Sequence, residues 1–166
     1  MTPWKKGRGA LGPLQPLIGR WISAPGAPGP ASATTCARVF EPFGKDYVRL
    51  EATWDMNAGN GGARGVYREI ALFGKGDAGV LAFWSFTSDG KRAQGVVCDG
   101  TDVHPQAIAF VAQMPAGTAR MIYWPNDTGV DAGDRFRFAV ENKVKAGWNR
   151  FFEHVYSTDA QAHVSI

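Results

Sequence analysis

The chain contains about ten strand-like segments, most of them joined by short connections, and no helix-length periodic segment lies between them. Parallel strands need long crossovers, usually helices, so consecutive strands here must pair antiparallel. A long meander either closes on itself or leaves two exposed edges, and closure removes both edges. We therefore predict an all-β fold, a closed antiparallel up-and-down β-barrel of about eight to ten strands. The predicted strands span 20–24, 33–43, 47–56, 64–73, 80–87, 92–98, 107–114, 118–124, 135–141 and 148–157.

Turn chemistry in the short connections supports this meander. Residues 76–79, 88–91 and 115–117 all contain glycine between two strand-like segments. Within the second of these, Asp89-Gly90 is a pair that type I′ hairpin turns prefer. Such turns join neighbouring antiparallel strands.

Alternating hydrophobicity gives two of the strands a clear inner face. In 47–56 the apolar positions are Val48, Leu50, Ala52, Trp54 and Met56, and in 135–141 they are Phe136, Phe138 and Val140. Residues 80–86 are apolar on both faces, so their orientation stays open. A subunit interface or a capping helical turn would cover the outer side of this segment.

The two ends of the chain frame the barrel domain, which is predicted to span 11–159. Residues 1–10 are predicted as a disordered tail and 160–166 as a C-terminal tail. Leucines at 11, 14 and 17 predict one short helical turn over 11–18 whose apolar side plugs the core. Residues 23–32 are too rich in Pro and Gly for a helix and are a candidate lid.

Composition argues against several classes of partner. The net charge is only +3, and part of it lies in Lys5, Lys6 and Arg8, so no nucleic-acid partner is expected. No stretch is apolar enough to span a bilayer, so no membrane partner is expected either. Cys36 and Cys98 lack the spacing of zinc ligands, and both are expected to be reduced thiols. With no export signal recognised, a cytoplasmic location is expected.

The segment 14–21 resembles the opening of calycin-superfamily barrels, in which a helical turn leads into a first strand carrying G-x-W. Gly19 and Trp21 occupy the matching positions. Lipocalins, fatty-acid-binding proteins and nitrobindin-like barrels share this layout, and the form here looks most like bacterial lipocalin-like and nitrobindin-like barrels. The resemblance implies that Trp21 closes one barrel end beneath a basic side chain of the last strand, for which Arg150 is the only candidate.

The last strand carries the most informative polar residues. By strict alternation one of its faces holds Trp148, Arg150, Phe152, His154 and Tyr156. If this face points inward, Arg150 can pair with a ligand carboxylate or phosphate and Tyr156 can add a hydroxyl. The alternative is an outward face with Arg150 in solvent.

We expect the barrel to bind a small, largely apolar molecule in its interior. The expected ligand-binding residues are Trp54, Trp84, Phe86, Phe110, Trp124, Phe138, Arg150, Phe152, His154 and Tyr156. Catalytic motifs and metal-ligand spacings are not recognised, so no catalytic residue, metal or cofactor is assigned, and an enzyme is the less favoured class.

Four alternatives remain open. The first is a haem-binding redox or isomerase protein of the nitrobindin-like type, with His154 as the iron ligand. The second is an isomerase or decarboxylase, activities that some calycin-like barrels host. The third is a barrel filled by side chains that acts through its outer surface. The fourth concerns the oligomeric state: the protein forms a homodimer rather than a monomer.

Overall fold

The computed structural model describes residues 4–23, 33–56, 65–127 and 135–158. These residues form a short 3₁₀ helix, η1 (Gly12–Leu17), followed by ten strands. The strands are β1 (Gly19–Ser23), β2 (Ala33–Phe43), β3 (Tyr47–Met56), β4 (Gly65–Lys75), β5 (Leu81–Thr87), β6 (Arg92–Cys98), β7 (Ile108–Met114), β8 (Gly117–Pro125), β9 (Arg135–Val144) and β10 (Gly147–Thr158). The predicted candidate lid lies outside the described residues except for Ser23, which ends β1.

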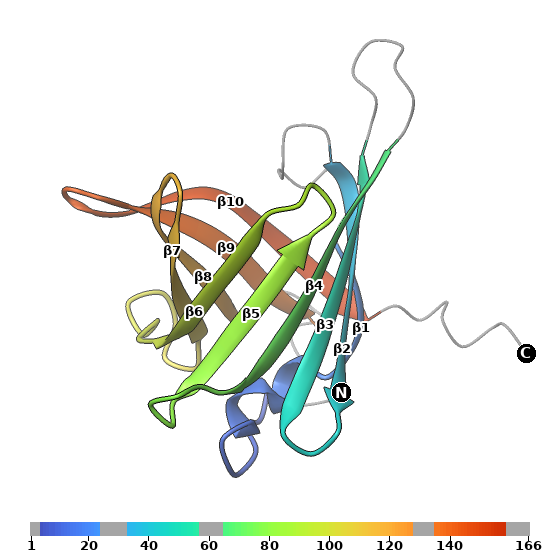
Figure 1. Cartoon of the computed structure of the whole chain (residues 1–166), viewed down its shortest axis with the longest axis vertical. Coiled ribbons are helices and arrows are strands. Elements are labelled where there is room, and N and C mark those ends of the chain that lie inside the picture. The colour runs from blue at the N-terminus through green and yellow to red at the C-terminus, as the bar shows by residue number, and fades with distance from the viewer. Residues whose placement is uncertain (1–3, 24–32, 57–64, 128–134, 159–166) are drawn as a thin grey trace, which may run out of the picture.

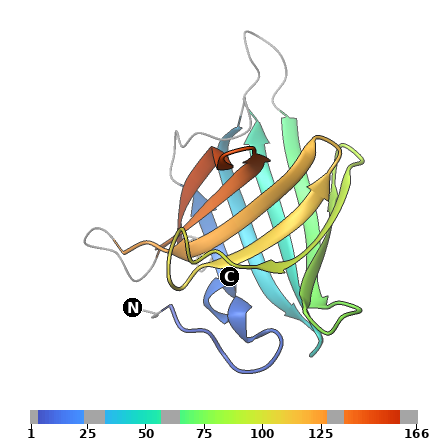
Figure 2. The same cartoon turned by 90° about the vertical axis from the view of Figure 1, so that its left-hand side faces the viewer.

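The strands form one closed barrel in which each strand pairs antiparallel with the next (Figures 1 and 2). The first and last strands close it, with Trp21 of β1 opposite Thr158 of β10. The predicted all-β, up-and-down barrel is confirmed, and the predicted strand limits differ from the observed ones by a few residues at most. Antiparallel pairing of all neighbours follows from the short connections, which leave no room for a crossover.

The helix η1 closes one end of the barrel, as Figure 1 shows below the strands. Leu14 and Leu17 are fully buried and belong to the same core cluster as the inward side chains of the strands. The indole N–H of Trp21 donates to the carbonyl oxygen of Leu17 at 2.8 Å, and the Trp21 ring meets the Phe136 ring edge-on at 4.8 Å. The predicted plug is therefore confirmed, and Trp21 lies at the closed end.

The segment before η1 differs from the predicted tail from residue 4 onward. The Trp4 indole N–H donates to the carbonyl oxygen of Gln106 at 3.2 Å, and the Lys6 ammonium donates to that of Ala107 at 3.1 Å. The Trp4 ring also lies 6.4 Å from the Phe136 ring, between their centroids. One large aromatic side chain thus supplies enough apolar contact to hold a polar segment against the plug end.

A β-bulge divides β10 into two parts with opposite orientation. In the pairing with β9, Arg150 lies opposite Glu141, but the next paired residue is Phe152, opposite Val140. Phe151 is the additional residue, and it shifts the alternation by one. Phe152, His154 and Tyr156 therefore face inward and Arg150 faces outward. The prediction of one shared face was wrong because strict alternation does not anticipate a bulge.

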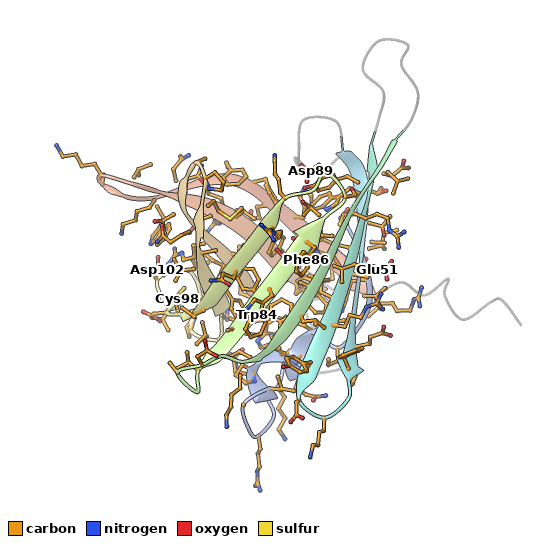
Figure 3. All side chains as sticks on the ribbon, in the orientation of Figure 1. Glu51, Trp84, Phe86, Asp89, Cys98 and Asp102 are labelled. Carbon is orange, nitrogen blue, oxygen red and sulfur yellow. The ribbon has the colours of Figure 1, made fainter. Side chains whose placement is uncertain are left out.

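The outer side of the barrel is covered unevenly. Over β7, β8 and β9, Val103 and Ala107 of the β6–β7 connection pack on an outer cluster that includes Ile122 and Trp124. On β5 the Trp84 and Phe86 side chains point outward instead, and Phe86 is 57% exposed (Figure 3). The helical turn packs with the inner core and does not cover this side. No helix within the described ranges has both the length and the apolar character to cross a membrane.

Candidate functional site

The barrel interior contains a cavity of about 390 Å³. Most of its wall is aromatic or aliphatic, and the aromatic residues include Trp54, Tyr67, Phe73, Phe83, Phe110, Tyr123, Phe138 and Phe152. Turn residues such as Lys91 and Ala116 also line it, and both lie at the barrel end opposite η1. The cavity is therefore apolar along its walls and opens away from the plug.

Arg38 is the buried cation of this cavity. It lies on β2 between Cys36 and Phe40, and strand alternation turns all three side chains inward. Only 2% of Arg38 is exposed. Because Arg is seldom buried without a partner, its surroundings indicate what the cavity is suited to hold.

Two tyrosine hydroxyls and an aromatic ring hold the Arg38 guanidinium. Its Nε donates to the Tyr156 hydroxyl at 3.0 Å, and its Nη1 donates to the Tyr123 hydroxyl at 3.3 Å. The Phe138 ring centroid lies 4.1 Å from the guanidinium carbon. Burial raises the pKa of Tyr123 to about 12 and that of Tyr156 further still, so both hydroxyls keep their protons at neutral pH. Each hydroxyl accepts from Arg38 and retains a proton to donate elsewhere.

No carboxylate of the described residues lies within 4.0 Å of the Arg38 guanidinium. Its hydrogen bonds in the described part of the chain occupy Nε and Nη1 and leave Nη2 available. Neutral hydroxyls satisfy donors but do not neutralise a buried positive charge, which is costly to keep away from water. The site therefore favours an anion beside Arg38.

Glu69 on β4 faces the same cavity. Arg38 lies opposite Ala52 of β3, and Ala52 lies opposite Glu69, so the three residues form one row across the inner wall. The small Ala52 side chain between them is fully buried, whereas Arg38 and Glu69 both line the cavity. Burial raises the pKa of the Glu69 carboxyl, and the Arg38 charge offsets only part of that effect.

The predicted ligand-binding residues divide into three groups. Four of them line the cavity, namely Trp54, Phe110, Phe138 and Phe152. His154 and Tyr156 are buried inside the barrel but belong to the polar layer around Arg38 rather than to the cavity wall. The remaining four, Trp84, Phe86, Trp124 and Arg150, lie on the outer side.

Arg150 is engaged on the outer surface of the barrel. Its Nε donates to Glu141 at 3.1 Å, and its Nη1 donates to Glu153 at 3.1 Å. Its guanidinium carbon also lies 5.1 Å from the Trp124 ring centroid. Arg150 therefore does not lie over Trp21, whose backbone partner on β2 is Arg38. The expected position of the basic residue on the last strand was therefore wrong.

Sequence reasoning missed Arg38 and Glu69. A signal for Arg38 was present, because period-2 alternation in 33–43 places one charged residue on the face shared by Cys36 and Phe40. A charge on an otherwise apolar strand face indicates a buried functional group. Glu69 had a weaker signal, since its strand alternates less clearly between polar and apolar residues.

His154 is enclosed by other rings. Its ring centroid lies 5.4 Å from that of Trp54 and 5.2 Å from that of Phe152, and its Nδ1 lies 3.4 Å from the Tyr156 hydroxyl. An axial haem ligand needs an open ring nitrogen facing a slot for the porphyrin. This packing does not fit a haem unless Trp54 or Phe152 moves. In the described residues no group of three His, Cys, Asp or Glu side chains could hold a metal ion.

A second, charged groove lies outside the barrel over β8, β9 and β10. Arg120 and Glu141 are each only 4% exposed there, and Arg120 Nη2 lies 2.6 Å from Glu141 Oε1. Arg120 also donates two hydrogen bonds of 2.9 Å to the Asp102 carboxylate, in the β6–β7 connection. These contacts hold the β6–β7 connection against the barrel. Because acidic and basic side chains alternate in the groove, it shows no preference for a ligand of either charge.

Comparisons with protein-family models, with curated proteins and with solved structures find no match for this chain. The fold and the site therefore define its class: a closed ten-stranded antiparallel β-barrel with an apolar interior cavity and a buried arginine.

Proposed function

We propose that the barrel binds a small, largely apolar acid whose anionic head group meets Arg38. The observation that carries this proposal is the fully buried guanidinium without a carboxylate within 4.0 Å in the described residues. A ligand carboxylate accepting a charge-assisted hydrogen bond from Nη2 supplies the missing negative charge. The proposal replaces Arg150 with Arg38 as the head-group residue and keeps the expected class of ligand.

Tyr123 contributes to the same head-group site. Its hydroxyl accepts from Arg38 and lines the cavity, so its own proton is available to the ligand. A carboxylate beside Arg38 then receives one hydrogen bond from the guanidinium and one from this hydroxyl. The apolar tail extends along the rings of Trp54, Phe110 and Phe138 toward the open end. Apolar walls with a few fixed polar groups are typical of small-molecule sites.

The size of the cavity supports a small ligand, and the charges at its mouth support an anionic one. A volume of about 390 Å³ falls within the range of small-molecule pockets, so the interior is not filled by side chains. Lys91 and Arg92 line the mouth of the cavity and attract an approaching anion. The resemblance of residues 14–21 to calycin barrels, many of which hold apolar ligands inside, supports the same class.

A displacement titration tests the proposal. An environment-sensitive fluorophore is bound to the purified protein and displaced by decanoic acid or by 1-decanol, which has the same tail without the charge. We expect one molecule per chain and tighter binding of the acid by about tenfold or more, because a hydrogen bond to a buried charge is worth about 1.5–3 kcal/mol. Equal affinities, or failure of both compounds to bind, would reject the Arg38 site.

A further inference from the structure

Glu69 is the acidic residue that lines the cavity, and it has no role in the head-group site described above. In the described part of the chain its carboxylate makes no hydrogen bond and no ion pair within 4.0 Å. The nearest polar neighbour in register is Thr87 on β5. The Thr87 hydroxyl is already engaged with Asp89 at 2.5 Å and with the Lys91 carbonyl oxygen at 3.2 Å. Glu69 therefore presents its carboxyl to the cavity.

The position of Glu69 relative to Arg38 limits what can lie between them. The Cα atoms of the two residues are two strand spacings apart, about 10 Å, with only the Ala52 methyl group between them on the inner wall. Both side chains are long enough to extend over Ala52 from opposite sides. A ligand head group held by Arg38 thus lies within a few atoms of the Glu69 carboxyl.

A plain carboxylate satisfies Arg38 but leaves Glu69 without a partner. Bound to Arg38, it would place a second negative charge close to Glu69 in an apolar cavity, where like charges repel strongly. Glu69 would then have to take up a proton, or the ligand would lose affinity. A hydrogen-bond donor on the ligand changes the sign of this interaction, because Glu69 can accept from it. Sites that leave a buried polar group unpaired discriminate strongly against ligands lacking the matching group.

We infer that the preferred ligand is a bifunctional acid, with an apolar tail, a carboxylate for Arg38 and a donor group, hydroxyl or amine, near the carboxylate for Glu69. The inference rests on the proposed function and adds the chemistry of the head group to it. Because Arg38 and Glu69 flank the same Ala52, we expect the donor close to the carboxylate, and the test places it on the third carbon. The apolar tail contacts the same aromatic wall whether the donor is a hydroxyl or an amine.

The test compares three acids with the same tail: decanoic acid, 3-hydroxydecanoic acid and 3-aminodecanoic acid. Each displaces the fluorophore from the wild-type protein, from Glu69→Leu and from Glu69→Gln at pH 7. Glu51→Gln, on the outer face of β3, is the matched control. Thermal unfolding of each variant checks that it is folded.

In the wild-type protein we expect one donor-bearing acid to bind at least about tenfold more tightly than decanoic acid. Comparison of 3-hydroxydecanoic acid with 3-aminodecanoic acid shows whether the preferred donor is a hydroxyl or an amine. In Glu69→Leu the preference should fall below about twofold, while decanoic acid binds as well as before or better. In Glu69→Gln a preference for the amine should vanish, because the amide carries no charge, and a preference for the hydroxyl should be retained in part. If Glu69→Leu does not fold and the wild-type protein prefers the amine, Glu69→Gln tests the inference instead. If the wild-type protein prefers the hydroxyl, Glu69→Ala replaces Glu69→Leu.

Four results would overturn the inference. If the three acids bind the wild-type protein with equal affinity, or if the preference survives in full in Glu69→Leu or Glu69→Ala, the bifunctional head group is rejected and the Arg38 site stands. If decanoic acid binds most tightly, the same conclusion holds. If none of the acids binds, the proposed function fails together with the inference.

Discussion

Arg38 Nε donates a hydrogen bond to the Tyr156 hydroxyl at 3.0 Å, linking β2 and β10 inside the barrel across 118 positions of sequence. The two strands are not neighbours, since β1 lies between them. The bond therefore depends on closure of the barrel. It also orients the guanidinium so that Nη2, rather than Nε, is available to the cavity.

Replacing Arg38 removes the proposed head-group partner. We expect Arg38→Met to weaken decanoic acid binding by about 10-fold to 100-fold, the loss of one charge-assisted hydrogen bond, with little effect on 1-decanol. Fluorophore displacement measures both ligands. Arg150→Met is the matched control, because Arg150 lies outside the barrel on Glu141 and Glu153. Equal losses in the two variants would contradict the interior site.

Glu69 should make stability depend on pH. Its folded-state pKa is raised above the usual 4.5 by burial, so the folded state holds the proton more tightly than the unfolded state does. Stability is then present in full below pH 4.5 and is lost as pH rises through the folded-state pKa. We expect the melting temperature of Glu69→Gln, relative to wild type, to increase between pH 4 and pH 7. Thermal unfolding of the ligand-free protein at several pH values measures this difference.

Glu51 provides a control of opposite sign. A hydrogen bond from Arg68 lowers the pKa of the Glu51 carboxyl, so its contribution to stability is present at neutral pH and is lost as pH falls through the folded-state pKa. The melting temperature of Glu51→Gln, relative to wild type, should therefore decrease between pH 4 and pH 7. If both variants shift in the same direction, burial is not the dominant influence on Glu69.

The outer ion-pair network should stabilise the fold through its buried members. Arg120→Leu leaves the Glu141 carboxylate, 4% exposed, with Arg150 as its remaining partner. Removing one partner of a buried pair is costly, and we expect a loss of about 3 kcal/mol in the free energy of unfolding. Urea denaturation followed by tryptophan fluorescence measures it. Arg49→Met breaks surface pairs with Glu41 and Glu51 and should cost about 1 kcal/mol or less.

His154 separates a plain ligand binder from a haem protein. Because Trp54 and Phe152 enclose its ring, we predict no stoichiometric haem. Hemin is added to the purified protein and to His154→Ala, and the Soret band is followed. A broad band of equal intensity in both proteins is the expected result. A sharp band at one haem per chain that disappears in the variant would favour the haem-binding alternative over the plain ligand binder, since such a band requires an axial imidazole.

The two cysteines should differ in their reactivity. Cys36 and Cys98 are free. Cys36 is fully buried in the barrel core, whereas Cys98, the last residue of β6, is half-buried against the outer cluster (Figure 3). Titration with a thiol reagent should modify Cys98 slowly in the native protein and Cys36 only after denaturation, two thiols in total. Rapid reaction of Cys36 in the native state would contradict its place in the core.

Local patterns in the sequence were sufficient to predict the barrel architecture. Short glycine-containing connections force neighbouring strands to pair antiparallel, and ten strands arranged this way close into a barrel to satisfy their edges. Alternation in β3 and β9 correctly identified Trp54 and Phe138 as inward residues, and the leucines of 11–18 correctly identified the plug. These features are local, so pattern and turn chemistry are sufficient to predict them.

The polar residues that share the interior could not be predicted from local patterns. A single bulged residue, Phe151, turned Arg150 outward and Phe152 inward, and no local pattern marks its position. Arg38, Tyr123 and Tyr156 meet because barrel closure brings β2, β8 and β10 around one cavity. Hydrogen bonds between residues so far apart in sequence depend on the register of every strand pair, and that register is a property of the folded barrel as a whole.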